Sequence, residues 1–142
     1  MSERKRLVLD ANILIRACLG QRVRQLIAEF VSEVDFYAAE ANVLEAAGYI
    51  SELATRRGLD EQICKEAFVS LMTLVNSVES ALIEACRTEA LERIRDPADW
   101  PALALALQLE CAIWTEDQDF FGTGVATWTT ATVERYFKGS GS

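Results

Sequence analysis

The chain has 142 residues, 51% hydrophobic and 25% charged, which is enough apolar material for one buried core and favours a single domain. The formal net charge is −8 and histidine is absent, which excludes Ser-His-Asp triads, Cys-His dyads and histidine-bearing zinc sites. No apolar run approaches the roughly 20 residues of a membrane span, and the N-terminus lacks a signal peptide's long apolar stretch, so we expect a cytoplasmic protein without membrane association.

Strand and helix signals alternate along the first 75 residues. Short runs rich in apolar and β-forming residues predict buried strands at residues 6–9 and 34–38, and the first of these ends at Asp10. Apolar residues spaced three and four apart predict helices in the segments between the strands. These helices are expected at residues 11–19, 23–31, 40–57 and 60–75.

The alternation continues to the end of the chain. Further strands are expected at residues 77–79, 112–115 and 125–129, and further helices at residues 81–94, from Asp99 through the run ALALALQL, and at residues 131–137. This order predicts an α/β fold with a mostly parallel central sheet of four to five strands flanked by helices. We expect one domain over residues 1–138, and a flexible end or cloning remnant at residues 139–142, which read GSGS.

Acidic residues follow two of the predicted strands directly. Asp10 comes immediately after the first strand, and Asp117 lies two residues after the strand at 112–115, with Asp119 close behind. In a parallel sheet, ligands bind outside the carboxyl ends of the strands, so two strands deliver acids to the same edge. This coincidence distinguishes these residues from the many other acids of the chain.

Asp99 has two interpretations. A helix that starts at Asp96 would place Pro101 at its fifth residue, where the proline ring clashes with the preceding turn. A helix that starts at Asp99 places Pro101 in the first turn, where it is tolerated, and helix capping alone would then explain the aspartate. The functional interpretation is that this helix begins at the same edge as Asp10 and Asp117.

Glu45 is a weaker candidate when taken by itself. It lies off the face of its helix that carries the apolar residues, so a solvated glutamate is the ordinary interpretation. Its neighbours Ala41 and Gly48, one turn away on either side, are small and leave room for a ligand.

Four segments of the chain resemble the acidic motifs of the PIN-domain nucleases in their expected order, a family that includes the VapC-type toxins of toxin–antitoxin pairs. The resemblance extends over residues 7–137. The first and last segments match most specifically, with D-A/T-N at a strand end and T-x-D-x-D-F after a later strand. The four segments are LVLDANILIRA, ANVLEAAGYI, DPADWPALALAL and WTEDQDFFG.

The resemblance implies a set of metal-binding and catalytic acids. These are Asp10, Glu45, Asp99 and Asp117, with Asp119 as an accessory metal ligand. It further implies that Asn12 and Thr115 are polar supports near the metal. It also implies an RNA substrate, an antitoxin partner and a homodimer, for which the apolar residues of the helices between Glu40 and Val75 could supply the interface.

The chemistry of such a site follows from its carboxylates. Several carboxylates in one pocket repel one another, and a divalent cation supplies the compensating charge. Oxygen ligands favour Mg²⁺ or Mn²⁺ over zinc, and such a cation activates water for phosphodiester hydrolysis. We therefore expect a metal-dependent endoribonuclease that needs no nucleophilic side chain.

RNA binding has to overcome the net charge of −8. The candidate positive groups come in clusters, and most clusters of this kind are simply solvated. Trp100 and Phe120 lie beside two of the motif acids and could stack a base, although core packing is the commoner role for such residues. The candidate clusters are Arg4 with Lys5 and Arg6, Arg22 with Arg24, Arg56 with Arg57, and Arg93 with Arg95.

The sequence is compatible with two other functions. One is a PIN-like module that has lost catalysis and binds a protein, with which the acidic composition is compatible. The other is a phosphatase that forms an aspartyl-phosphate at Asp10, which ranks lower because Asn12 stands where a second aspartate is usual.

Overall fold

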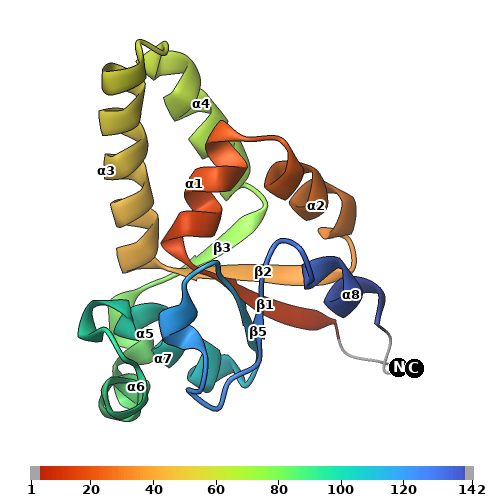
Figure 1. Ribbon diagram of the computed structural model, residues 1–142, viewed down its shortest axis with the longest axis vertical. Helices are drawn as coiled ribbons and strands as arrows, with labels where there is room; N and C mark the ends of the chain where they lie inside the picture. Colours follow the sequence, from red (N-terminus) through yellow and green to blue (C-terminus); the bar gives the residue numbers. More distant parts are fainter. Residues whose placement is uncertain (1–3, 140–142) are drawn as a thin grey trace.

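A five-stranded parallel sheet lies at the centre of the molecule in this computed structural model, which describes residues 4–139 (Figure 1). The strand order is β3-β2-β1-β4-β5, and all four neighbouring pairs are parallel. The predicted fold class, an α/β domain with a parallel sheet flanked by helices, is therefore confirmed. The strands are β1 (Lys5–Leu9), β2 (Val34–Ala39), β3 (Val75–Val78), β4 (Ala112–Trp114) and β5 (Thr127–Trp128).

Helices cover both faces of the sheet, and two of them extend beyond it (Figure 1). One face carries α1 (Ala11–Leu19), α2 (Arg22–Phe30) and α8 (Val133–Lys138), and the other carries α5 (Ser80–Ile83), α6 (Arg87–Arg93) and α7 (Trp100–Leu109). The remaining pair, α3 (Glu40–Arg57) and α4 (Glu61–Met72), forms a hairpin beside α1. Three short 3₁₀ turns are η1 (Glu84–Cys86), η2 (Pro97–Asp99) and η3 (Gln118–Phe120).

The alternation of side chains along the central strand explains the two layers. Leu7 and Leu9 of β1 point into the core under α1, α2 and α8, whereas Val8 points into the core against α5, α6 and α7. All three side chains are fully buried. Successive residues of a strand face opposite sides of the sheet, so a run that is apolar at every position forms a strand covered on both faces.

Three regions of the chain differ most from the predicted bounds. β3 begins at Val75, because Val75 already pairs with Phe36 of β2, and the preceding helix ends at Met72. The helix expected at residues 81–94 is broken into α5, η1 and α6, which lets both helices pack against α7. β5 is limited to Thr127 and Trp128, the two residues paired with β4.

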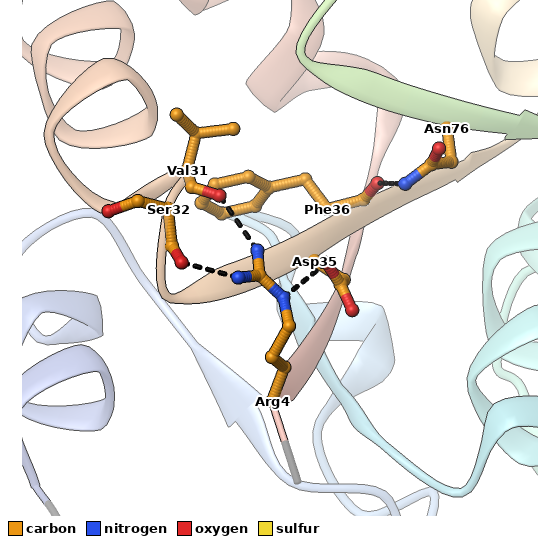
Figure 2. Close-up of polar contacts among 6 residues, drawn as sticks. All are labelled: Arg4, Val31, Ser32, Asp35, Phe36 and Asn76. Atoms are coloured by element: carbon orange, nitrogen blue, oxygen red, sulfur yellow. Dashed lines mark hydrogen bonds and ion pairs between the residues drawn. The ribbon is translucent and has the colours of Figure 1, made fainter.

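Arg4, directly before β1, forms hydrogen bonds at the edge of the sheet opposite to the edge where Asp10 and Asp117 lie. Figure 2 shows the guanidinium of Arg4, which donates to the carboxylate of Asp35 at 2.8 Å and to the carbonyl oxygens of Val31 and Ser32. The figure also shows the amide of Asn76 donating to the Phe36 carbonyl at 3.0 Å, which ties β3 to β2. Arg4 is thus occupied in joining β1 to the connection between α2 and β2.

Within residues 4–139, no helix has the length and apolar composition that crossing a membrane requires. The tail predicted at residues 139–142 lies outside the described residues except for Gly139, and its nature stays a prediction.

Candidate metal centre

The order in which the chain adds strands reverses between β1 and β4. Asp10 and Asp117 follow the carboxyl ends of these two strands. From β1 the chain proceeds outward through β2 and β3, then returns to the other side of β1 with β4. The pairing continues one step past both strands, since the backbone N–H of Asp10 donates to the Trp114 carbonyl at 3.1 Å. Ligand sites of open α/β sheets lie at such a switch point, outside the strand ends.

Asp10 is buried and firmly oriented. Its Oδ1 accepts from the backbone N–H of Ala11 at 2.8 Å, and its Oδ2 accepts from the Asn12 amide and the Thr115 hydroxyl, both at 2.8 Å. Burial raises the pKa of Asp10, and the charges of Asp117 and Glu45 raise it further, against the opposing hydrogen bonds from Thr115 and Ala11. These contacts place Asn12 and Thr115 where the resemblance implied polar supports.

Thr115 connects the two strand ends. Its hydroxyl donates to Asp10 and accepts from the backbone N–H of Asp117 at 2.9 Å. The Asp117 Oδ1 in turn accepts from the backbone N–H of Asp119 at 2.9 Å, which caps η3. Because Thr115 is fully buried, this network fixes the loop that carries both later acids.

Asp99 occupies the N-cap position of α7, as predicted, but capping does not explain the aspartate. Its side chain makes no capping hydrogen bond; Asp96 caps the preceding turn η2 instead, where its side chain accepts from the backbone N–H of Ala98 at 3.0 Å. The turn η2 thus takes up the residues before Trp100, and Pro101 falls in the first turn of α7 as predicted.

The Asp99 carboxylate lies among other acids. Its Oδ2 is buried and has no hydrogen-bond partner in the described part of the chain. Burial raises the pKa of Asp99 to about 7, and the neighbouring Asp117, Asp10 and Asp96 add to the rise. A buried carboxylate oxygen without a partner is costly, and a bound cation is one way to satisfy it.

Asp96 joins this group and was not singled out from the sequence. Ligand oxygens of Asp96, Asp99 and Asp119 lie within 4.8 Å of one another, close enough to hold one metal ion. Asp96 and Asp99 stand three residues apart around a proline, and this spacing was the available signal. The nearest cation is Arg95, whose guanidinium lies 3.9 Å from Asp119.

Glu45 lies on the exposed side of α3, close enough to Asp10 for its charge to act on that residue. One turn earlier, the amide of Asn42 is buried, and its Oδ1 has no hydrogen-bond partner among residues 4–139. Asn42 was not singled out from the sequence, although it precedes the buried Ala46 and Ile50 by four and eight residues on the same face of α3.

Two predictions about nearby aromatic residues have clear outcomes. Phe120 is fully buried in the core, so the suggestion that it stacks a base is wrong. Trp100 is partly buried and lies beneath the guanidinium of Arg87, 5.0 Å from the ring centroid, so one face of its ring is already covered.

Most of the predicted basic clusters are engaged in ion pairs. Arg4 pairs with Asp35, and Arg22 pairs with Glu134. Further pairs along single helices join Arg56 to Glu52 and Arg93 to Glu89.

The donor set fits a hard divalent cation. The candidate ligands are carboxylate oxygens only, which favour Mg²⁺ and Mn²⁺ over softer metals. The partnerless oxygen of Asp99 and the triad that it forms with Asp96 and Asp119 support the same conclusion. The arrangement can therefore hold a divalent cation at the carboxyl edge of the sheet.

Comparisons with solved structures find the same fold in several proteins. PAE2754 from Pyrobaculum aerophilum superimposes with a TM-score of 0.72 at 13% identity, over 96% of this chain and 91% of that one. VapBC2 from Rickettsia felis, described as bound to a DNA fragment from their promoter, superimposes with a TM-score of 0.65 at 12% identity. The match covers 87% of this chain and 98% of that one. A toxin–antitoxin complex from Klebsiella pneumoniae superimposes with a TM-score of 0.63 at 19% identity, over 87% of this chain and 97% of that one.

At the level of sequence, no curated protein matches the chain. The family profile described as the PIN domain does match, over residues 8–138. This range includes every acid of the candidate centre and nearly the whole described structure. The chain therefore belongs to the PIN-domain family.

Proposed function

We propose that this protein is an endoribonuclease that depends on Mg²⁺ or Mn²⁺. The observation that carries the proposal is the convergence of carboxylates from separate segments on Asp99, whose Oδ2 is buried without a partner. Asp10 from the end of β1 and Asp117 from the loop after β4 both act on Asp99, and Asp119 of the same loop has a ligand oxygen within 4.8 Å of one of Asp99. Glu45 of α3 lies close enough to act on Asp10. Membership of the PIN-domain family gives independent support for a nuclease.

The acids have the roles in the proposed site that the family resemblance implies. Asp10, Glu45, Asp99 and Asp117 are the metal-binding and catalytic acids, with Asp119 as an accessory ligand. A bound divalent cation would activate water and offset negative charge on the phosphodiester. Asp10 is held in one orientation by the hydrogen bonds from Asn12 and Thr115.

Asp99 is the residue best suited to contact the attacking water. Its Oδ2 is buried and makes no hydrogen bond within residues 4–139, so it would gain a partner from a cation or from a water held by that cation. In contrast, both oxygens of Asp10 are occupied by donors, which favours a ligand role there over nucleophilic attack. This occupancy also counts against the aspartyl-phosphate mechanism.

The test is cleavage of single-stranded RNA by purified protein at low ionic strength, where weak electrostatic binding is strongest. Cleavage should require Mg²⁺ or Mn²⁺, stop in EDTA and return when the metal is restored. Asp10→Asn should reduce the rate at least about a hundredfold. A contaminating ribonuclease would cleave whatever the variant, so loss of cleavage in Asp10→Asn, purified identically, excludes contamination. Asp60→Asn, which neutralises the exposed N-cap acid of α4, should cleave like the wild type and controls for the loss of one charge.

Analysis of the product ends completes this test. Water attack leaves 5′-phosphate and 3′-hydroxyl ends, whereas attack by the RNA's own 2′-hydroxyl leaves cyclic 2′,3′-phosphates. Cyclic ends, or equal cleavage by Asp10→Asn and the wild type, would refute the proposal. Absence of cleavage in every metal would favour the alternative, a catalytically silent PIN-like binding module.

The proposed biological setting is the cytoplasmic toxin of a toxin–antitoxin pair. Similar folds occur in the Klebsiella pneumoniae toxin–antitoxin complex and in VapBC2, which supports an antitoxin partner here. A homodimer is proposed on separate grounds, because the α3–α4 hairpin exposes several large apolar side chains. These are Leu44, Leu59, Ile63 and Val69.

A further inference from the structure

A cavity of about 470 Å³ lies between α1, the start of α2 and the far half of α3. Three arginines line it, Arg16, Arg22 and Arg57, together with Tyr49 and Thr130. We propose that this cavity binds backbone phosphates of the RNA strand next to the bond that is cut. The inference rests on the proposed ribonuclease function and assigns the strand-binding subsite that such an acidic chain requires.

The charge around the cavity is opposite to that of the whole molecule. The chain carries 22 acids against 14 Lys and Arg residues, yet no acidic residue among those described lines this cavity. A locally positive concave surface concentrates field lines and attracts polyanions even when the net charge is negative.

Two of the arginines have no partner in the described part of the chain. Most Lys and Arg side chains there form ion pairs with acids, and Lys5 and Arg6 donate to backbone carbonyls. The remaining four form neither an ion pair nor a hydrogen bond within residues 4–139, and they are Arg16, Arg24, Arg57 and Arg135. Arg16 and Arg57 both line this cavity, so its free cations are available to an external anion.

Arg22 is the third cation and is already paired. Its guanidinium lies 2.9 Å from the Glu134 carboxylate, with both side chains substantially solvated. An exposed ion pair of this kind is weak, so Arg22 can exchange its partner at little cost. The apolar residues Leu19, Val23 and Leu53 complete the lining and offer a surface for a base or ribose.

Hydrogen bonds connect the rim of the cavity to the candidate metal centre. The backbone N–H of Thr130 donates to the Glu116 carboxylate at 2.8 Å, and the backbone N–H of Glu116 donates to the Asn12 amide oxygen at 3.3 Å. Asn12 in turn donates to Asp10 at 2.8 Å. The cavity and the acids are thus neighbouring parts of one surface.

The spacing of residues along α1 and α3 also places the cavity beside the acids. Arg16 follows Asn12 by four residues on α1, and Tyr49 follows Glu45 by four residues on α3, so each pair shares one face of its helix. Arg57 lies two further turns along α3, and at 1.5 Å per residue it is roughly 18 Å from Glu45 along the axis. The three residues mark a path that leads away from the acids, as a bound strand would.

Tyr49 provides a surface for a base on this path. Its side chain is 43% exposed, and base stacking on an exposed aromatic ring tolerates any sequence. A phenolic ring between two free arginines is a combination that single-stranded RNA can use without sequence-specific contacts.

The test compares two pairs of substitutions that change the net charge equally. The cavity pair is Arg16→Gln with Arg57→Gln, and the matched control is Arg24→Gln with Arg135→Gln, which removes the two unpaired arginines elsewhere. Both pairs are made in an Asp99→Asn background so that bound RNA stays intact. Binding of a labelled single-stranded RNA is followed by fluorescence anisotropy from 25 to roughly 200 mM salt, a range over which phosphate contacts respond strongly.

The cavity pair should bind RNA at least about tenfold more weakly than the control, and its slope of log K against log salt should fall by roughly 1.4, or 0.7 per lost phosphate contact. Tyr49→Ala should weaken binding while Tyr49→Phe should not. Equal loss in both pairs would overturn the subsite, since it would reflect overall charge alone. Unchanged RNA affinity with loss of binding to a copurified protein partner would overturn it in favour of a protein-binding groove.

Cleavage by the same pairs without the Asp99 change separates this inference from the proposed function. If the cavity pair cleaves like the wild type at low RNA concentration, the subsite is wrong and the ribonuclease stands. If RNA binds through the cavity but no metal supports cleavage, the subsite stands and the ribonuclease is wrong. If RNA does not bind at low salt, both fail.

Discussion

The surroundings of Asp99 disfavour a negative charge on its carboxylate. Its oxygen Oδ2 is buried without a hydrogen-bond partner in the described structure, and three other acids raise its pKa. Most aspartates at the start of a helix cap the first turn and gain stability from it. Asp99 does not, so its charge costs stability in the absence of a cation and becomes favourable when one is bound.

The pH dependence of the metal-free protein should show this cost. The folded-state pKa of Asp99 is raised from 3.8 to about 7, so the folded state holds more protons than the unfolded state between these values. The stabilisation from the protonated group is complete below pH 3.8 and is lost as pH rises through about 7. In EDTA, the melting temperature of the wild type should therefore carry a decrease across this range that Asp99→Asn lacks.

Asp99→Asn also distinguishes function from stability. At pH 8 in EDTA this variant should melt at least a few degrees higher than the wild type, because it lacks the repelled charge. It should nevertheless lose most of its cleavage in Mg²⁺ or Mn²⁺. A variant that is less stable than the wild type at pH 8, or that keeps full activity, would remove Asp99 from the proposed site.

Individual site residues were predictable to different extents. Asp10 and Asp117 could be located from sequence because each follows a buried strand, and parallel strands end at one edge. The role of Asp96 could not, because an acid beside a proline at a helix start is ordinarily a cap, and Asp96 does cap η2. Its approach to Asp119 depends on how two loops pack, which local patterns do not specify.

Among the elements, those with strong local patterns were predicted best. The helix α3 was expected at residues 40–57 and is found there, ended by Gly58 in the left-handed conformation at φ 67°. The start of β3 was placed two residues too late, and the break between α5 and α6 was missed. Their boundaries depend on pairing with β2 and on packing against α7, which are contacts between distant segments.

The α3–α4 hairpin carries a prediction about assembly. Ile63 and Val69 are 63% and 67% exposed, and several large apolar side chains left exposed on one hairpin are typical of an interface. We expect the wild type to be a dimer by light scattering in solution, and Ile63→Lys with Val69→Lys to yield monomers with an unchanged circular dichroism spectrum.

A control on another element makes this measurement specific. Leu82 of α5 is 61% exposed but lies away from the hairpin, so Leu82→Lys should leave the dimer intact. A wild type that is monomeric at all concentrations, or a dimer that survives both hairpin substitutions, would contradict the proposed interface.

For the whole molecule, the distribution of charge is more informative than its sum. A net charge of −8 argues against nucleic-acid binding when taken alone. The structure shows acids gathered at the switch point of the sheet, while Arg16 and Arg57, which find no partner among residues 4–139, line one neighbouring cavity. Composition could not reveal this separation, because it depends on which arginines find acidic partners in the folded chain.

The most direct measurement of the central claim is calorimetric titration of the metal-stripped protein with Mn²⁺. Binding to the clustered acids should give a measurable heat with a dissociation constant at or below about a millimolar. Asp10→Asn and Asp99→Asn should each weaken it markedly, and Asp60→Asn should bind like the wild type. Absence of any heat with millimolar Mn²⁺ or Mg²⁺, or equal binding by all four proteins, would contradict a metal centre at this edge of the sheet.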